Sequence, residues 1–191
     1  MSLTSAFVVW LTGRPGSGKT TIANALAAEL RRRGADRVEL LDGDELRATA
    51  LSRGLGFSRE DRDENVRRVG FVAGLLARNG VVAIVSLVSP YEGAREEVRA
   101  GIDRFVLVHA DCAPEELARR DPKGHYAKAR RGEMASFTGV SDPYEPPMRP
   151  DLRIRTDEMS VAHAVARIVE HLERAGYLAA APVPSGRSPV A

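Results

Sequence analysis

The sequence predicts a three-layer α/β fold, in which a parallel sheet of five strands lies between two layers of helices. Short, mainly apolar stretches recur along the chain, at residues 7–11, 38–41, 81–88 and 105–108, with a weaker fifth at 152–154. Uninterrupted apolar runs of this length are typical of strands buried on both faces. Stretches with helical periodicity lie between them, and strands that alternate with helices form a parallel sheet covered on both faces.

Three stretches carry the spacing of helices. Apolar residues recur every four positions over residues 22–30. A second helix is expected to begin at Ser58, where Ser58 and Asp61 fit a capping box, and to end near Gly80. A third occupies residues 161–174.

The chain length of 191 residues predicts one domain. We expect this domain to occupy residues 1–178, with a disordered tail of mainly Ala, Pro, Ser and Gly over residues 179–191. Residues 121–150 are polar and rich in Gly, Pro and basic side chains. A connection of this length is usually functional, and we interpret it as a lid.

Composition limits the class of protein. The net charge of +2, from 28 basic and 26 acidic residues, does not favour a nucleic-acid-binding protein. Cys112 is the single cysteine, so an internal disulfide is excluded and a reducing cytoplasm is the expected location. We find no signal peptide and no apolar stretch long enough to span a bilayer, so no membrane partner is expected.

The strongest local motif is a glycine-rich loop between the first strand and the first helix. It reads Gly13, Arg14, Pro15, Gly16, Ser17, Gly18, Lys19 and Thr20. This pattern is a phosphate-binding P-loop, in which backbone N–H groups and the positive end of the following helix face the phosphates. Lys19 is expected to hold the β- and γ-phosphates of ATP, and Thr20 to bind Mg²⁺. A guanine-specific N-K-x-D motif is absent from the sequence.

Two carboxylates, Asp42 and Asp44, end the second strand. The carboxyl edge of a parallel sheet is where ligands bind, so these side chains are expected beside the P-loop. One carboxylate could orient Mg²⁺ or its waters and one could accept a proton from an attacking hydroxyl. Alternatively Asp44 caps the following helix, and the two roles can coexist. We favour a functional role mainly for Asp42.

Further motifs follow in a fixed order. They are Asp42-Gly43-Asp44, Gly56-Phe57-Ser58, the run from Asp61 to Arg68, Ser89-Pro90-Tyr91, the run from Arg120 to Gly124, Phe137-Thr138-Gly139 and the run from Asp142 to Pro147. From about Phe7 to Leu172 this series resembles the adenylylsulfate kinase family of P-loop NTPases. The resemblance implies transfer of the ATP γ-phosphate to the 3′-hydroxyl of adenosine 5′-phosphosulfate, with Mg²⁺, for sulfate assimilation. It also implies a homodimer, and association with ATP sulfurylase remains open.

The resemblance assigns roles to individual residues. Catalytic roles are implied for Lys19, Asp42, Asp44 and Ser89. ATP contacts are implied for Gly13, Pro15, Gly16, Ser17, Gly18, Lys19, Thr20, Arg119, Met159 and Ala164. Contacts with the acceptor are implied for Asp42, Gly43, Asp44, Glu45, Arg47, Phe57, Arg62, Asn65, Val88, Ser89, Lys123, Ser136 and Phe137. The metal ligands are Thr20 and Asp42, and the rings of Phe57 and Phe137 are expected to enclose the acceptor's adenine.

Several alternatives stay open at this stage. Phe57 could be a core residue, and Arg62 and Asn65 could belong to a solvated, salt-bridged helix face. Ser89 could form a covalent intermediate, but direct in-line transfer needs none, so a contact with substrate or a turn-capping role is favoured.

The sequence also departs from the family pattern. Arg14 and Pro15 replace the usual Leu-Ser, Glu45 replaces Asn, His125 replaces Leu and Ala127 replaces Lys. These departures leave two other functions open, a kinase of another nucleotide or small metabolite and a non-catalytic nucleotide sensor.

Overall fold

The structure, a computed structural model, describes residues 6–121, 124–134 and 136–179. Five parallel strands form one sheet in the order β2-β3-β1-β4-β5. The strands are β1 (Val8–Thr12), β2 (Val38–Asp42), β3 (Val82–Ser86), β4 (Phe105–Asp111) and β5 (Leu152–Arg155). The predicted parallel five-stranded sheet is therefore confirmed.

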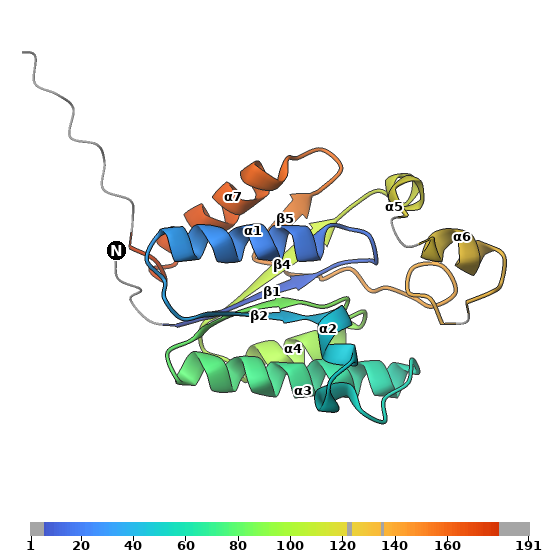
Figure 1. Cartoon of the computed structure of the whole chain (residues 1–191), viewed down its shortest axis with the longest axis horizontal. Coiled ribbons are helices and arrows are strands. Elements are labelled where there is room, and N and C mark those ends of the chain that lie inside the picture. Colours follow the sequence, from blue (N-terminus) through green and yellow to red (C-terminus); the bar gives the residue numbers. More distant parts are fainter. Residues whose placement is uncertain (1–5, 122–123, 135, 180–191) are drawn as a thin grey trace, which may run out of the picture.

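Helices cover both faces of this sheet (Figure 1). They are α1 (Lys19–Arg32), α2 (Gly43–Arg47), α3 (Arg59–Arg78), α4 (Glu92–Ala100), α5 (Pro114–Arg120), α6 (His125–Arg130) and α7 (Val161–Arg174), with a 3₁₀ turn η1 (Ala50–Ser52). Helices α1 and α7 pack on one face, and α3 and α4 on the other. Among the described residues, no helix is long and apolar enough to cross a membrane.

The central strand β1 shows why a strand of this sheet can be apolar throughout. Val9 and Leu11 belong to the core beneath α1 and α7, whereas Val8 and Trp10 belong to the core beneath α3. Successive side chains of a strand point to opposite faces. With a core on each face, every position of the strand is buried, and the run cannot alternate with polar residues.

The end of β3 and the cap of α2 differ from the prediction. The third strand stops at Ser86 rather than continuing to residue 88. Ser89 has a positive φ of 38°, which a strand does not accommodate, and Pro90 has no N–H for a ladder. Helix α3 begins as predicted, because the Ser58 side chain accepts a hydrogen bond from the Asp61 N–H. Asp44 does not cap α2: the cap is Asp42, whose carboxylate accepts from the Asp44 N–H.

The predicted lid contains a helix of its own. Helix α6 and the chain around it form a small apolar cluster away from the sheet. The cluster consists of Cys112, Leu117, Tyr126, Ala129 and Phe137, with Met134 packed against it. The Tyr126 hydroxyl donates to the Pro15 carbonyl at 2.8 Å, so the lid lies against the P-loop. The proposed disordered tail falls outside the described residues except for residue 179.

Candidate active site

The P-loop joins β1 to α1 in the conformation that a phosphate site needs. Gly16 and Gly18 have φ of 77° and 86°, a region that favours glycine. A Cβ on Gly13 would lie 2.4 Å from the Ala110 carbonyl, so this position has no room for a side chain. The Lys19 ammonium donates to the Gly13 and Arg14 carbonyls at 2.9 and 3.0 Å. The loop thus holds its cation in place before a phosphate binds.

Three oxygen atoms meet at the carboxyl edge of the sheet beside this loop. Thr20 Oγ1 donates to Asp42 Oδ2 at 2.7 Å and lies 3.2 Å from Ser86 Oγ. Ser86 was not predicted, although it stands opposite Asp42 in the β2–β3 register and ends a buried strand. Hydroxyl and carboxylate oxygens are the ligands that Mg²⁺ prefers. The donors therefore fit the expected Mg²⁺ ligands Thr20 and Asp42, with Ser86 as an additional oxygen.

The two carboxylates of this edge differ in their surroundings. Asp42 is buried and both its oxygens are engaged, Oδ2 by Thr20 and Oδ1 by the Asp44 N–H at 2.9 Å. Asp44 and Glu45 are exposed on the first turn of α2. A Cβ on Gly43 would lie 2.8 Å from the Leu87 side chain, so α2 begins directly against the end of β3.

An exposed aromatic ring follows α2. Phe57 is 59% exposed, so the alternative of a core phenylalanine is wrong. The guanidinium carbons of Arg47 and Arg62 lie 4.7 and 5.4 Å from the centre of its ring. Arg47 also donates to the Gly56 carbonyl at 2.9 Å. Burial, and then the positive charge of Arg62, lower the pKa of Arg47.

Arg62 connects this ring to the lid. It is 9% exposed, and its Nε donates to the Phe57 carbonyl at 2.9 Å. Its Nη2 donates to the Ser136 carbonyl and lies 3.2 Å from Asp142 Oδ2. Asn65 is 3% exposed and accepts from Ser52 Oγ at 2.7 Å. Neither side chain belongs to a solvated helix face, so that alternative is wrong.

The turn after β3 is built into the core. Ser89 is buried, its Oγ accepts from the Trp10 indole N–H at 3.1 Å, and it lies 3.4 Å from the Leu87 carbonyl. The Val88 carbonyl accepts from Thr12 Oγ1 at 2.7 Å. These partners favour a turn-building role for Ser89 over a covalent one.

In the lid, Phe137 is buried and packs against Tyr126. Its ring lies edge-on to Tyr126, with the ring centres 5.1 Å apart. The ring contacts among the described residues pair Phe137 with Tyr126 and His125, not with Phe57. The structure brings Ser136 to Arg62 through its carbonyl group. Lys123 lies outside the described residues.

The residues expected around the adenine of ATP lie on different elements. Arg119 is an exposed side chain on α5 that pairs with Glu116 at 2.7 Å. Met159 is half-buried against the core beneath α1 and α7. Ala164 is buried on the first turn of α7. No described contact joins these three residues.

A P-loop with an ordered lysine, an oxygen cluster at the adjacent strand ends and a lid on the loop define a class, the nucleotide-dependent P-loop kinases of small molecules. The model of the family "Adenylylsulphate kinase" matches residues 5–155, and the chain belongs to this family.

Individual relatives agree along almost the whole chain. An adenylyl-sulfate kinase of Rippkaea orientalis is 53% identical over 171 residues, which cover 90% of this chain and 93% of that one. The Mycobacterium tuberculosis APS kinase CysC, solved in complex with AMPPNP and APS, has a TM-score of 0.82 and 41% identity and covers 88% of this chain and 98% of that one. A hexameric APS kinase from Thiobacillus denitrificans has a TM-score of 0.69 and 38% identity, covering 91% of this chain and 30% of that one.

Proposed function

We propose that this chain transfers the γ-phosphate of ATP to the 3′-hydroxyl of adenosine 5′-phosphosulfate and releases ADP and 3′-phosphoadenosine 5′-phosphosulfate. The observation that carries the proposal is Arg62, which is buried between the exposed Phe57 ring and the lid and carries the positive charge that an acceptor phosphosulfate requires. The relative solved with AMPPNP and APS, which shares this fold, supports the same pair of substrates.

ATP binds at the P-loop in this proposal. The backbone N–H groups of the loop and the amino-terminal end of α1 face the phosphates, and Lys19 exchanges its two carbonyl contacts for the β- and γ-phosphates. Mg²⁺ held by Thr20 and Asp42, when bound, offsets the negative charge of the transferred group. Arg119 and the chain from Met159 to Ala164 frame the adenine.

The proton of the attacking hydroxyl goes to a carboxylate. Both oxygens of Asp42 are already engaged, which assigns it to positioning Thr20 and the metal. The exposed Asp44, on the first turn of α2, is the better placed base. The acceptor's adenine stacks on Phe57, and Arg62 faces its phosphosulfate group. Asn65, Lys123 and the carbonyl of Val88 complete the acceptor contacts.

A coupled ADP-release assay tests the reaction, with adenosine 5′-phosphosulfate, AMP, adenosine and no acceptor in parallel. We expect turnover with adenosine 5′-phosphosulfate alone. Turnover with another acceptor would instead support the second candidate, a kinase of another small metabolite. The exposed Glu45, where the family has Asn, is the observation that keeps this candidate open, so Glu45→Asn is the variant to compare. ATP binding without any turnover would favour the nucleotide sensor.

The outer face of α3 supports the expected homodimer. Phe71 and Leu75 lie one turn apart and are 67% and 44% exposed. Glu64 and Arg78 lie seven residues before and after Phe71. Two copies of α3 packed antiparallel about Phe71 would bring Glu64 of one copy opposite Arg78 of the other, so the face is complementary to itself.

Light scattering after gel filtration tests the dimer. We expect Phe71→Arg to give a monomer, whereas Met148→Arg, at a position 82% exposed near the end of the lid, leaves the dimer intact. A hexamer, the state of the Thiobacillus denitrificans relative, or a wild-type monomer would contradict the proposal. A cytoplasmic location, supported by the free Cys112 thiol, is part of the same proposal, as are a single kinase domain over residues 1–178 and the possible association with ATP sulfurylase.

A further inference from the structure

A fully buried arginine lies beneath the acceptor side of the site. The side chain of Arg95, on α4, is 0% exposed. Its Nη1 donates to the Ser89 carbonyl at 2.5 Å, and its Nη2 donates to the Glu145 carbonyl at 2.7 Å. Nη2 also pairs with the Glu92 carboxylate. One guanidinium group therefore holds the turn after β3, the start of α4 and the chain that returns from the lid.

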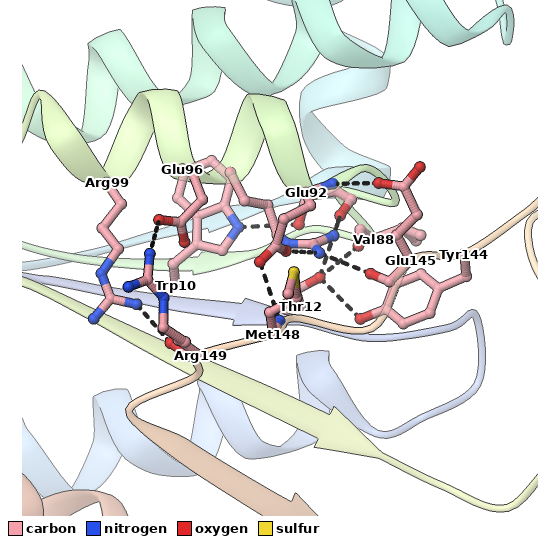
Figure 2. Close-up of polar contacts among 12 residues, drawn as sticks. Trp10, Thr12, Val88, Glu92, Glu96, Arg99, Tyr144, Glu145, Met148 and Arg149 are labelled. Atoms are coloured by element: carbon pink, nitrogen blue, oxygen red, sulfur yellow. Dashed lines mark hydrogen bonds and ion pairs between the residues drawn. The ribbon is translucent and has the colours of Figure 1, made fainter.

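The carboxylates of Glu92 and Glu145 close this arrangement (Figure 2). The Glu92 N–H donates to Glu145 Oε2 at 2.7 Å, and Glu92 Oε1 accepts from the Met148 N–H at 3.0 Å. The Glu145 N–H in turn donates to the Pro90 carbonyl at 2.8 Å. We call residues 144–148 the lid root, because this segment fixes the end of the lid to the start of α4.

The lid root reaches the P-loop through Thr12, the residue before Gly13. Thr12 Oγ1 donates to the Val88 carbonyl at 2.7 Å and lies 3.2 Å from the Tyr144 hydroxyl. The Arg95 guanidinium lies 5.9 Å from the centre of the Tyr144 ring. The turn at Val88 and Ser89 and the lid root thus meet at Arg95. Figure 2 shows Thr12, the residue before the P-loop, beside Val88 and Tyr144.

Core stability alone does not account for this buried charge. Replacing a buried ion pair by apolar residues is often neutral or stabilising, so such a pair is weak evidence of a stabilising role. Arg99, one turn further along α4, also holds a carbonyl and a carboxylate, of Arg149 and Asp151, both at 2.8 Å. Those partners lie beyond the lid root, which makes Arg99 a matched control.

We infer that Arg95 is a positioning residue for the acceptor, which acts by holding the turn at Val88 and Ser89 against the lid root. This inference rests on the proposed function, because it assigns the turn to the acceptor rather than to ATP. Ser89 has a positive φ of 38°, a backbone conformation that must be held by its surroundings. The Arg95 contact to its carbonyl supplies that restraint.

Steady-state kinetics of Arg95→Lys, Arg95→Met and Arg99→Lys test the inference. Lysine keeps the positive charge but lacks the planar guanidinium group, so it cannot bond two carbonyls and a carboxylate at once. We expect Arg95→Lys to raise the KM for adenosine 5′-phosphosulfate roughly tenfold, about 1.4 kcal/mol, with the KM for ATP within about twofold of wild type. Arg99→Lys should change neither KM. Equal increases in both KM values, or none, would overturn the inference. If Arg95→Met does not fold, the two KM values of Arg95→Lys alone test the inference.

Amide hydrogen exchange supplies a readout that does not depend on the acceptor's identity. In Arg95→Lys we expect exchange to accelerate roughly tenfold at the N–H groups of Glu92, Glu145 and Met148. The Asp151 N–H, which donates to the Leu107 carbonyl, should exchange as in wild type. Unchanged exchange at the lid root overturns the role of Arg95 even if the enzyme is active. Wild-type protein that does not phosphorylate adenosine 5′-phosphosulfate overturns the proposed function, and the exchange experiment then decides on the lid root separately.

Discussion

Arg62 contacts both the aromatic ring of Phe57 and the lid. It donates to the carbonyls of Phe57 and Ser136 and faces Asp142. Because lysine cannot reproduce several directed bonds with one point charge, Arg62→Lys should lower kcat/KM for adenosine 5′-phosphosulfate roughly a hundredfold, about 2.7 kcal/mol. The KM for ATP should stay near wild type. Arg67→Lys, which alters an exposed pair with Glu97, is the control. Equal kcat/KM values for the two variants would remove Arg62 from the acceptor site.

His109 makes stability depend on pH. It lies beneath the P-loop, stacked on Tyr144. Its pKa is lowered to about 4, mainly by burial; the charge of Asp111 raises the pKa and nearby arginines lower it. These arginines are Arg153, Arg95 and Arg14. In the unfolded chain the pKa is about 6.5, so between these values the unfolded state binds more protons, and the free energy of unfolding falls as the pH falls.

The contribution of His109 to the pH dependence of stability can be measured with a variant that has an aromatic ring but no titratable group. From pH 7.5 to pH 5.0, His109 should remove about 2 kcal/mol from the free energy of unfolding, because only the unfolded chain takes up the proton. Over the same pH interval, the free energy of unfolding of His109→Phe should fall by about 2 kcal/mol less than that of the wild type. Urea titrations of both proteins at the two pH values make the comparison. Identical losses would show that His109 is not held neutral in the folded protein.

At the scale of elements, α3 and α4 pack through a glycine. A Cβ on Gly70 of α3 would lie 2.5 Å from a methyl group of Val98 on α4. Gly70→Ala should therefore force the two helices apart and lower the free energy of unfolding by about 1–3 kcal/mol. At Gly93 of α4, a Cβ would meet nothing within 4 Å. Gly93→Ala should raise stability by up to about 1 kcal/mol, since alanine is the better helix former. Urea midpoints of the two variants should move in opposite directions, and a shared direction would contradict this packing argument.

The elements that the sequence predicts well are those whose own residues show the pattern of a strand or a helix. The buried strands were found because cores on both faces leave them uninterrupted apolar runs. The edge strand β5 has the weakest apolar pattern of the five strands, since Arg153 and Arg155 alternate with its buried residues. The bounds of helix α6 could not be predicted: it is short and polar, and it is held by contacts of Tyr126 with the P-loop and with Phe137.

At the scale of the whole molecule, the site likewise has residues that the sequence predicts and residues that it does not. The P-loop and Asp42 could be predicted because they belong to contiguous motifs. Ser86 and Arg95 could not, because their partners Thr20 and Glu145 are 66 and 50 residues away in the sequence. Only the parallel sheet brings these segments to one edge. The sequence also does not decide between Asp42 and Asp44 as the cap of α2, because the cap depends on which carboxylate the folded turn brings to an N–H group.

Because the P-loop, the turn at Val88 and Ser89 and the lid root meet at one edge of the sheet, binding at that edge should stabilise the whole chain. A ligand at a hundred times its Kd adds about 2.7 kcal/mol, which corresponds to roughly 5–10 °C in Tm for a domain of this size. We expect shifts of this order with a non-hydrolysable ATP analogue and, separately, with adenosine 5′-phosphosulfate. In Lys19→Ala the Tm shift with the ATP analogue should disappear, because the variant lacks the ammonium group that would leave its two carbonyl partners and bind the phosphates. The Tm shift with adenosine 5′-phosphosulfate should persist. Arg32→Ala, at the far end of α1, should retain both shifts. A Lys19→Ala protein that still responds fully to the ATP analogue would show that nucleotide binds elsewhere.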